Sequence, residues 1–451
     1  MSSVLTWGPV GGVHPRTSSR LKAVQASPHA MWNYVTYRDA IRVLGLDPDE
    51  IYPDGATRLD PAHWVDLGWL TCFAGPPESA VTAMRAAVNA EALNQYPPDL
   101  LEPLRDEAAR FLGAKRGPDL EVIGTAGAQE GISLSLMATV DPGDEVIVSD
   151  PGYFHVPSAV LAVGGIPVEV PITAASGFRL DPEAVAARIT PRTRAVVIID
   201  PVNPYGTVAT RSELEHLATL ADRHGLMLIH DVTHGALGIE PDANLHPLPS
   251  LGLTGNATAT FSVSHCWGMA GARVGFLAGP SDLMRGCLRL KAALTRLNTN
   301  LVSQLAALAG LRDADYLDHA ANIVRANLAH LEQTLEASDG LRLVVRPQRG
   351  LSCAVDTSAA GVSAQELLIA LFARKVAVYP GDGMGESTAA SMIRINLSRP
   401  DARAMQQLRA VLPDALAEAQ TGRWRDAVIE LLERKGTARG ARLAHALRAK
   451  P

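Results

Sequence analysis

Cysteine is scarce in this chain of 451 residues, and the four cysteines present (Cys72, Cys266, Cys287 and Cys353) show no CxxC spacing. A structural zinc site or a disulfide framework is therefore not expected, and a reducing compartment fits this usage. Long apolar runs are also missing, so no segment is predicted to span a bilayer. The first residues lack the basic flank and continuous apolar core of a secretion signal. These absences predict a cytoplasmic protein without a membrane partner.

The sequence also lacks an excess of one charge. The net charge is only -6, and acidic and basic residues are mixed along the chain. No nucleic-acid partner is expected, because no basic stripe or DNA-binding motif stands out. With 47% hydrophobic and 20% charged residues, the composition is that of a globular protein long enough for two domains. No internal repeat is visible.

Short apolar runs rich in β-branched residues alternate with helical segments through the middle of the chain. Four of these runs cover 144–150, 166–172, 194–200 and 225–231. Strands that alternate with helices in this way predict a mostly parallel sheet covered by helices on both faces. A smaller α/β unit follows it. The predicted fold class is therefore α/β, with a large domain and a smaller C-terminal α/β domain.

The expected organisation has four parts. They are an N-terminal extension (1–65), an arm and linker (66–102), a large domain (103–325) and a small domain with a helical tail (326–451). Within the extension, a helix is predicted over 32–46. Trp32 and Tyr34 are candidates for covering the mouth of a site, although an ordinary packing helix explains the same pattern.

The segment GTAGAQEG, residues 124–131, lies where a predicted strand passes into a helix. Its small residues leave the backbone amides of Gly127, Ala128 and Gln129 free to face an anion at the helix N-terminus. Glycine-rich turns of this kind also serve purely steric needs, so the segment alone does not establish a phosphate site.

Two further strands end in polar residues. Asn203 follows the strand over 194–200, and Asp231 ends the strand over 225–231. Ligand sites of α/β proteins gather at this edge of the sheet. Asp231 would be a buried carboxylate and would need a cationic or donor partner. A simple turn at Asn203 and a helix cap at Asp231 are the alternatives.

The segment SVSHCWGMAGARVGF, residues 262–276, adds Ser262, Ser264, His265 and Arg273. An arginine at a glycine-flanked position near a phosphate site is suited to bidentate contact with the phosphate. In order and spacing, these segments together resemble the class I/II aminotransferase family, which has fold type I and depends on pyridoxal phosphate (PLP). The resemblance runs from about residue 66 to residue 399.

The resemblance implies a set of cofactor-binding residues. They are Gly127, Ala128, Gln129, Ser262 and Arg273 around the phosphate, and Tyr153, Asn203 and Asp231 around the ring. In the family, the tyrosine stacks on the ring, the asparagine bonds the ring oxygen, and the aspartate pairs with the protonated ring nitrogen, which keeps the ring an electron sink.

Three more positions follow from the resemblance. Tyr96 looks like the tyrosine that reaches the phosphate of the other subunit, so a homodimer is expected. Arg394 looks like the arginine that clamps the α-carboxylate of the substrate, and Gly68 matches a backbone contact near that carboxylate. The implied substrate is an α-amino or α-keto acid.

Two positions depart from the family pattern. The lysine expected eight residues before Arg273 is His265, and the tyrosine expected three residues after Asp231 is His234. Histidine cannot form the stable Schiff base that lysine forms with the cofactor aldehyde. An imidazole with an ordinary pKa of about 6.5 can still move protons as a general base.

The sequence therefore predicts an enzyme that binds PLP, or its amine form pyridoxamine phosphate (PMP), non-covalently. His265 would be the proton shuttle and His234 its neighbour, in transamination or in PMP-dependent elimination. Other readings stay open. One is a cofactor-free catalyst that uses both histidines. Another is an inactive binding protein of the same fold, in which His265 is inert or an introduced substitution. A metal site at His230, Asp231 and His234 is not expected, because the first two point to opposite faces of a strand.

Overall fold

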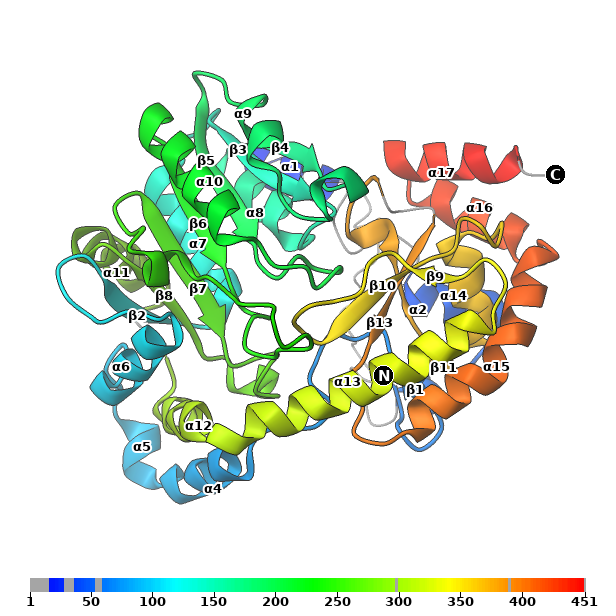
Figure 1. Ribbon diagram of the computed structural model, residues 1–451, viewed down its shortest axis with the longest axis horizontal. Coiled ribbons are helices and arrows are strands. Elements are labelled where there is room, and N and C mark those ends of the chain that lie inside the picture. Colours follow the sequence, from blue (N-terminus) through cyan, green and yellow to red (C-terminus); the bar gives the residue numbers. More distant parts are fainter. Residues whose placement is uncertain (1–15, 28–35, 53–58, 297–298, 388–390, 450–451) are drawn as a thin grey trace.

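The protein is described by a computed structural model that places residues 16–27, 36–52, 59–296, 299–387 and 391–449. Trp32 and Tyr34, the two candidates for covering the site, lie outside the described residues. Three sheets and the helices around them make up the described chain, and each of the two larger sheets belongs to its own unit in Figure 1.

The larger unit is built on a seven-stranded sheet in the order β2-β8-β7-β6-β5-β3-β4. Its strands are β2 (Glu121–Thr125), β3 (Glu145–Asp150), β4 (Ile166–Pro171), β5 (Thr193–Ile199), β6 (Met227–Asp231), β7 (Ala257–Ser262) and β8 (Gly275–Gly279). Only β8 runs antiparallel to its neighbours, β2 and β7. The predicted mostly parallel sheet is confirmed.

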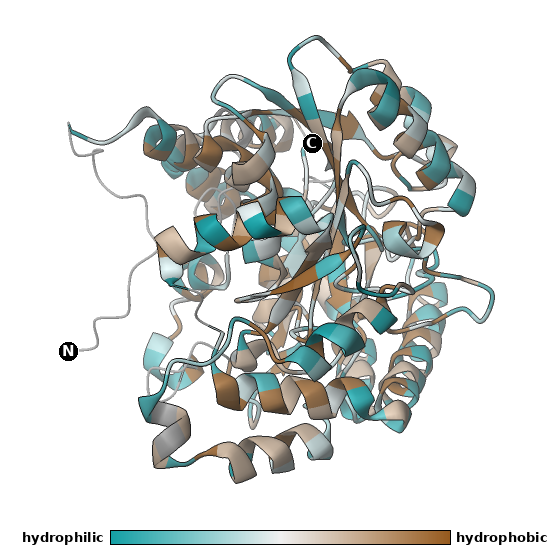
Figure 2. Ribbon diagram, turned by 90° about the vertical axis from the view of Figure 1, so that its left-hand side faces the viewer, coloured by the Kyte–Doolittle hydropathy of each residue, from teal (hydrophilic) through white to brown (hydrophobic). Residues whose placement is uncertain are grey.

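Both faces of this sheet are buried, which explains why its strands read as continuous apolar runs. In β3, Val146 and Val148 pack into one cluster, and Ile147 packs into another on the opposite face. The helices of this unit are α6 (Glu102–Phe111), α7 (Ala128–Thr139), α8 (His155–Val163), α9 (Pro182–Ala186), α10 (Arg211–His224) and α11 (Ser281–Thr295). Figure 2 shows hydrophobic residues along the strands and hydrophilic ones on the outer faces of the helices.

The smaller unit holds a four-stranded antiparallel sheet in the order β12-β13-β10-β9. Its strands are β9 (Arg342–Leu343), β10 (Ser352–Asp356), β12 (Tyr379–Pro380) and β13 (Met392–Asn396). The helices around it are α14 (Ala364–Phe372), α15 (Arg403–Gln420), α16 (Arg425–Arg434) and α17 (Ala438–Arg448). The helix α13 (Ala314–Glu336) leads from the larger unit to this one (Figure 1). The second, smaller α/β unit is thus confirmed, while the residue limits of the four expected parts stay a prediction.

The N-terminal extension contacts both units. Its helix α1 (Ser19–Ala26) packs on α8 of the larger unit, and α2 (Tyr37–Leu44) packs on α14 of the smaller one. A short helix, α3 (Pro48–Ile51), follows, and β1 (Val65–Asp66) pairs in parallel with β11 (Val376–Ala377). The helices α4 (Glu78–Ala87), α5 (Ala90–Asn94) and α12 (Leu301–Arg312) lie below the larger unit in Figure 1.

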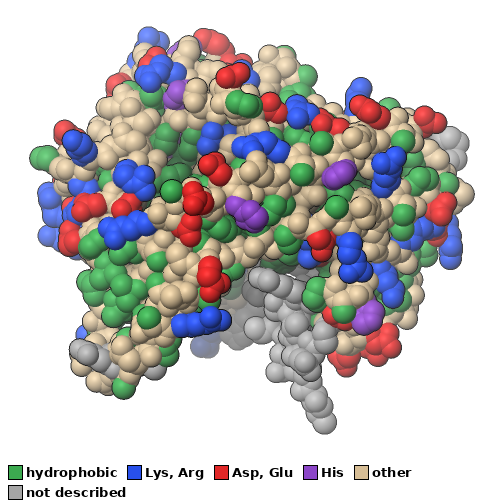
Figure 3. Space-filling view, turned by 60° about the horizontal axis from the view of Figure 1, so that its bottom comes forward, with side chains coloured by type: hydrophobic (Ala, Val, Ile, Leu, Met, Phe, Trp, Pro, Cys, Tyr) green, Lys and Arg blue, Asp and Glu red, His purple; other side chains and the backbone are tan. Residues whose placement is uncertain are grey.

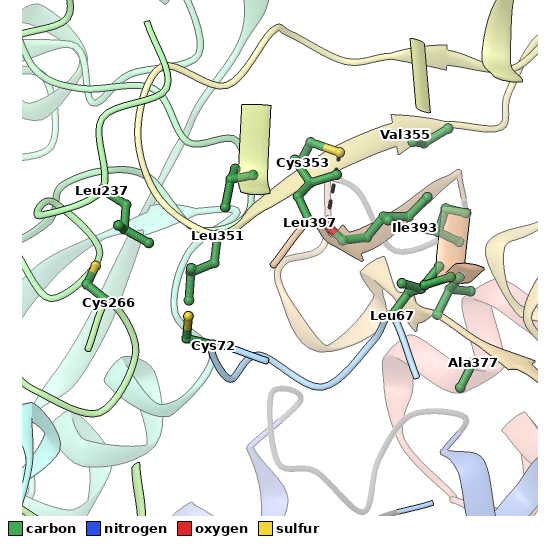
Figure 4. Packing of buried hydrophobic residues seen from close by; sticks show 14 of the residues in the cluster. Leu67, Cys72, Leu237, Cys266, Leu351, Cys353, Val355, Ala377, Ile393 and Leu397 are labelled. Carbon is green, nitrogen blue, oxygen red and sulfur yellow. Dashed lines mark hydrogen bonds between the residues drawn. The ribbon is translucent and has the colours of Figure 1, made fainter. Parts of the chain in front are cut away.

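An apolar cluster joins the two units around the segment that follows β1. Cys72, Leu237 and Leu351 meet there, and Leu67 and Leu397 continue the cluster toward the smaller sheet (Figure 4). Because these side chains are buried, the segment around residues 67–72 is fixed between the two sheets.

No helix in the described ranges is long and apolar enough to cross a membrane. On the face that Figure 3 shows, the basic side chains of the described residues are interspersed with acidic ones.

Candidate active site

The turn between β2 and α7, residues 126–128, is the predicted phosphate-binding segment and is called the anion turn below. Gly127 precedes α7 with a φ of 91°, in the region that favours glycine, and a Cβ there would lie 2.6 Å from Nη2 of Arg273. Arg273 donates from Nη2 to the Ala126 carbonyl at 2.6 Å, so its guanidinium lies against the turn. Ser262 is buried at the end of β7 and pairs with Gly275 of β8, and a Cβ on Gly275 would lie 2.5 Å from the Gly127 backbone. The predicted phosphate residues are therefore brought together, with helix α7 pointing its N-terminus at them.

Asp231 is a buried carboxylate without a charged partner. Its Oδ1 accepts hydrogen bonds from the backbone and the hydroxyl of Thr233. Burial raises its pKa to about 6, although the Thr233 hydrogen bonds oppose the shift. No arginine, lysine or histidine of the described ranges forms an ion pair with it. A cationic group placed in the pocket would relieve this desolvation.

His265 and His234 lie against each other in a tilted arrangement, with ring centroids 4.5 Å apart and an interplanar angle of 32°. Burial, helped by the cations Arg394 and Arg273 and opposed by the Leu70 backbone, lowers the pKa of His265 to about 4. Burial, then His265 and Arg394, also hold the pKa of His234 well below its usual range. The ordinary imidazole pKa assumed from the sequence is therefore wrong for both rings. Both are neutral at pH 7, and Nδ1 of His265 has no hydrogen-bond partner among the described residues.

Arg394 lies beside these rings on β13. It donates from Nη1 to Oδ1 of Asn203 at 3.4 Å and from Nη2 to the Gly68 carbonyl at 2.9 Å. Its guanidinium sits over the Tyr379 ring, 4.3 Å from the centroid. The predicted carboxylate residue thus contacts the predicted ring-oxygen residue, although 191 positions separate them in the chain.

The Gly68 amide is already engaged within the protein. It donates to Oδ1 of Asp66 at 3.0 Å, and the Trp69 amide donates to the same oxygen at 3.0 Å. The backbone contact to a substrate carboxylate that the sequence predicted at Gly68 therefore competes with Asp66, while its carbonyl already serves Arg394.

Tyr153 completes one side of the pocket. Burial raises the pKa of its hydroxyl, Asp231 raises it further, and Arg273 lowers it, so both charged groups act on this tyrosine. Tyr96 lies elsewhere. It is 73% exposed, and Arg296 covers its ring at 5.0 Å from the centroid.

Sequence reasoning missed a buried lysine behind the anion turn. The ammonium group of Lys291 donates to the carbonyl of Gly124, and it lies 3.5 Å from Oδ1 of Asp99 and 3.7 Å from Oε2 of Glu130. The signal was present, because Met284, Cys287 and Lys291 follow helical spacing along the buried side of α11. Glu130 in turn accepts the Ala126 amide at 2.6 Å, so the lysine supports the turn.

The sequence is similar to those of known proteins along most of its length. The family described as "Aminotransferase class I and II" matches residues 63–412. The chain is 31% identical over 356 residues to an aspartate/prephenate aminotransferase of Thermus thermophilus, which covers 75% of this chain and 90% of that one. It is 32% identical over 278 residues to an arginine–pyruvate transaminase of Pseudomonas aeruginosa, with 61% of this chain and 70% of that one covered.

Solved structures agree. A mutant aspartate aminotransferase of Thermus thermophilus has a TM-score of 0.75 at 26% identity, and covers 88% of this chain and 99% of its own. The aspartate aminotransferase from Rhizobium meliloti, at 22% identity and a TM-score of 0.75 over 90% of this chain and all of its own, shows the fold alone. The fold is fold type I, and the family consists of PLP-dependent transferases. The chain belongs to the class I and II aminotransferase family.

Proposed function

We propose that this protein is an aminotransferase-type enzyme that holds PLP or PMP non-covalently and acts on an α-amino or α-keto acid. His265 takes the position of the usual lysine and serves as the proton shuttle. The observation that carries this proposal is the pair of buried imidazoles of His265 and His234, whose ring centroids lie 4.5 Å apart, together with two arginines, Arg394 and Arg273, that are close enough to lower the pKa of His265.

The lysines of the chain support a non-covalent mode of binding. They are Lys22, Lys115, Lys291, Lys375, Lys435 and Lys450. None falls between residues 116 and 290, the range that includes β7 and Arg273. The buried one, Lys291, turns its ammonium group to Asp99 and Glu130 behind the anion turn.

The residues fit the cofactor. Asp231 is a buried carboxylate that forms no ion pair among the described residues, so it suits the protonated ring nitrogen of the cofactor. Gly127, Ala128, Gln129, Ser262 and Arg273 would hold the phosphate, and Tyr153, Asn203 and Asp231 the ring. When bound, this cofactor supplies an electron sink for negative charge at the substrate Cα.

The protein's own residues then divide the remaining work. Arg394 would bind the α-carboxylate and so fix the orientation of Cα. His265 is neutral at pH 7 and is therefore free to accept the proton at Cα and to return it at the cofactor's C4′ carbon. Because its pKa is low, the protonated ring gives up its proton readily, which favours the return of the proton. His234 lies against His265 and would be a second neutral acceptor of this proton.

Titration of the protein freed of small molecules, first with PLP and then with PMP, tests this proposal. Saturable one-to-one binding of either compound, followed by amine transfer between the loaded protein and an α-keto or α-amino acid, is the expected result. If neither compound binds at micromolar concentrations, the proposal is wrong, and a cofactor-free catalyst or an inactive binding protein becomes the better account.

The affinity for PLP is expected to fall in acid because of Asp231. Its pKa is about 6 in the free protein, so the carboxylate is ionised above pH 6 and protonated below it. If the ring nitrogen binds the ionised form, affinity falls about tenfold per pH unit below 6. Calorimetric titration of wild type and Asp231→Asn from pH 5 to 8 measures this. The variant, which has no group to protonate, should bind more weakly at pH 8 and lack this component of the pH dependence. Parallel curves for the two proteins would refute it.

We further propose that two copies complete each site. Tyr96 is well exposed, as expected of a residue that serves a partner's phosphate. Sedimentation should show a dimer, and Tyr96→Phe should weaken PLP binding without changing the sedimentation coefficient. A wild-type monomer that binds PLP as tightly as expected would contradict this assembly.

A further inference from the structure

The N-terminal extension places one side chain at the carboxylate end of the pocket. This side chain is Tyr37, the first residue of α2, and it lies before residue 63, where the family match begins. Its hydroxyl donates to Oδ1 of Asp66 at 3.4 Å. A Cβ added to Gly68 would lie only 1.8 Å from this hydroxyl oxygen, so the tyrosine occupies the space that a side chain at residue 68 would need.

The helix that carries Tyr37 is firmly attached. Thr36 and Asp39 form a capping box at its start, and Asp39 also forms an ion pair with Lys435 at 2.8 Å. Ala40 and Ile41 are buried. The Tyr37 ring packs on Phe372 of α14, with centroids 5.5 Å apart. The position of the hydroxyl is therefore set by the packing of α2 on the smaller unit.

A continuous set of hydrogen bonds runs from this hydroxyl to Arg394. Tyr37 donates to Asp66, and Asp66 accepts the amides of Gly68 and Trp69. The Gly68 carbonyl then accepts from Nη2 of Arg394 at 2.9 Å. Asp66 thus holds the amide of Gly68, and Arg394 binds its carbonyl. A shift of the Asp66 carboxylate would therefore move the carbonyl that orients the Arg394 guanidinium.

Charge gives the same network a second effect. Asp66 is buried, and burial raises the pKa of its carboxyl group, whereas the amides of Trp69 and Gly68, then Arg399 and Tyr37, lower it. The Tyr37 hydroxyl therefore favours the ionised form of Asp66 that accepts the two amides. Without it, this carboxylate has one donor fewer, and Gly68, whose carbonyl accepts from Arg394, is held less firmly.

We propose that Tyr37 is a positioning residue for the carboxylate-binding site: by holding Asp66 on the amides of Gly68 and Trp69, it keeps Arg394 oriented for the carboxylate of an α-keto or α-amino acid. This inference rests on the proposed function, in which Arg394 is that carboxylate's partner. It assigns to the extension a direct effect on substrate affinity.

The test compares Tyr37→Phe with Tyr52→Phe in the full-length, PMP-loaded protein. Tyr52 is a matched control, because it belongs to the same extension and is influenced by Asp66, yet no hydrogen bond joins the two among the described residues. Pyruvate, the smallest α-keto acid, is the probe. We expect the KM for pyruvate to rise about 3–10-fold in Tyr37→Phe, the usual net contribution of one hydrogen bond, with kcat and PMP affinity unchanged. Tyr52→Phe should behave as wild type.

The possible failures can be told apart. Equal KM values for wild type and Tyr37→Phe overturn the role of Tyr37 alone. A fall in kcat or in PMP affinity with no rise in KM also overturns it, since the residue would then act on the fold or on the cofactor. If wild type neither binds PMP nor converts pyruvate or any other α-keto acid tested, both the proposed function and this inference fall. Arg394→Gln should raise the KM far more than Tyr37→Phe, and an unchanged KM there would contradict the proposed function first.

Discussion

Replacing His265 by alanine is expected to lower turnover about 10²–10⁴-fold, the usual contribution of a general base, while PMP binding persists. The physical reason is that the imidazole is a neutral base whose Nδ1 has no hydrogen-bond partner among the described residues. Single-turnover amine transfer from the PMP-loaded protein to an α-keto acid measures the chemical step. Equilibrium titration with PMP measures cofactor binding separately.

Two further variants sharpen this prediction. His265→Asn keeps a polar side chain but has no titratable nitrogen, so it should fail as fully as His265→Ala. His265→Lys should bind PLP through a covalent bond that borohydride reduces, because the proposal assigns this position to the lysine of the family. Turnover retained in both His265→Ala and His265→Asn would remove His265 from the mechanism and direct attention to His234.

Replacing Lys291 by methionine is expected to destabilise the protein by about 3 kcal/mol, because it removes the buried cation shared by Asp99 and Glu130, although Asp99 keeps its ion pair with Arg105. Asp99 and Glu130 both lie within 3.7 Å of the ammonium group, and Lys291 itself is fully buried. The denaturant midpoint and its slope, followed by circular dichroism, measure the change. The same variant should weaken phosphate binding, because Glu130 accepts the amide of Ala126 in the anion turn.

Controls separate charge from packing. Lys115 is exposed, so Lys115→Met should change the free energy of unfolding by no more than about 0.5 kcal/mol. Adding Asp99→Asn to Lys291→Met removes one of the two carboxylates that lose Lys291 as a partner. The double variant should therefore recover part of the lost free energy of unfolding. A Lys291→Met protein that unfolds at the wild-type midpoint would show that the buried ion pairs contribute nothing to stability.

The architecture could be predicted from the sequence because each strand of the larger sheet corresponds to a local run of apolar residues. The apolar runs from 144 to 231 became β3, β4, β5 and β6, in the parallel arrangement that their alternation with helices predicts. Asp231 and Asn203 follow adjacent strands, so their meeting at one sheet edge could also be predicted.

The remaining features depend on contacts that no local pattern records. Tyr37 reaches Asp66 only because α2 packs on α14, and nothing in its helical spacing distinguishes that role. The low pKa values of His234 and His265 arise from burial of the two rings together with the nearby arginines, and burial cannot be read from the residue types alone. The engagement of the Gly68 amide by Asp66 is likewise a result of the folded turn.

The central claim is that the cofactor is held without a covalent bond to the chain. Intact-protein mass spectrometry after borohydride reduction of the PLP-loaded protein tests it most directly, together with identification of the small molecule released on denaturation. We predict an unmodified chain mass and stoichiometric release of PLP or PMP. A reduced adduct on any of the six lysines, Lys291 included, would contradict the account.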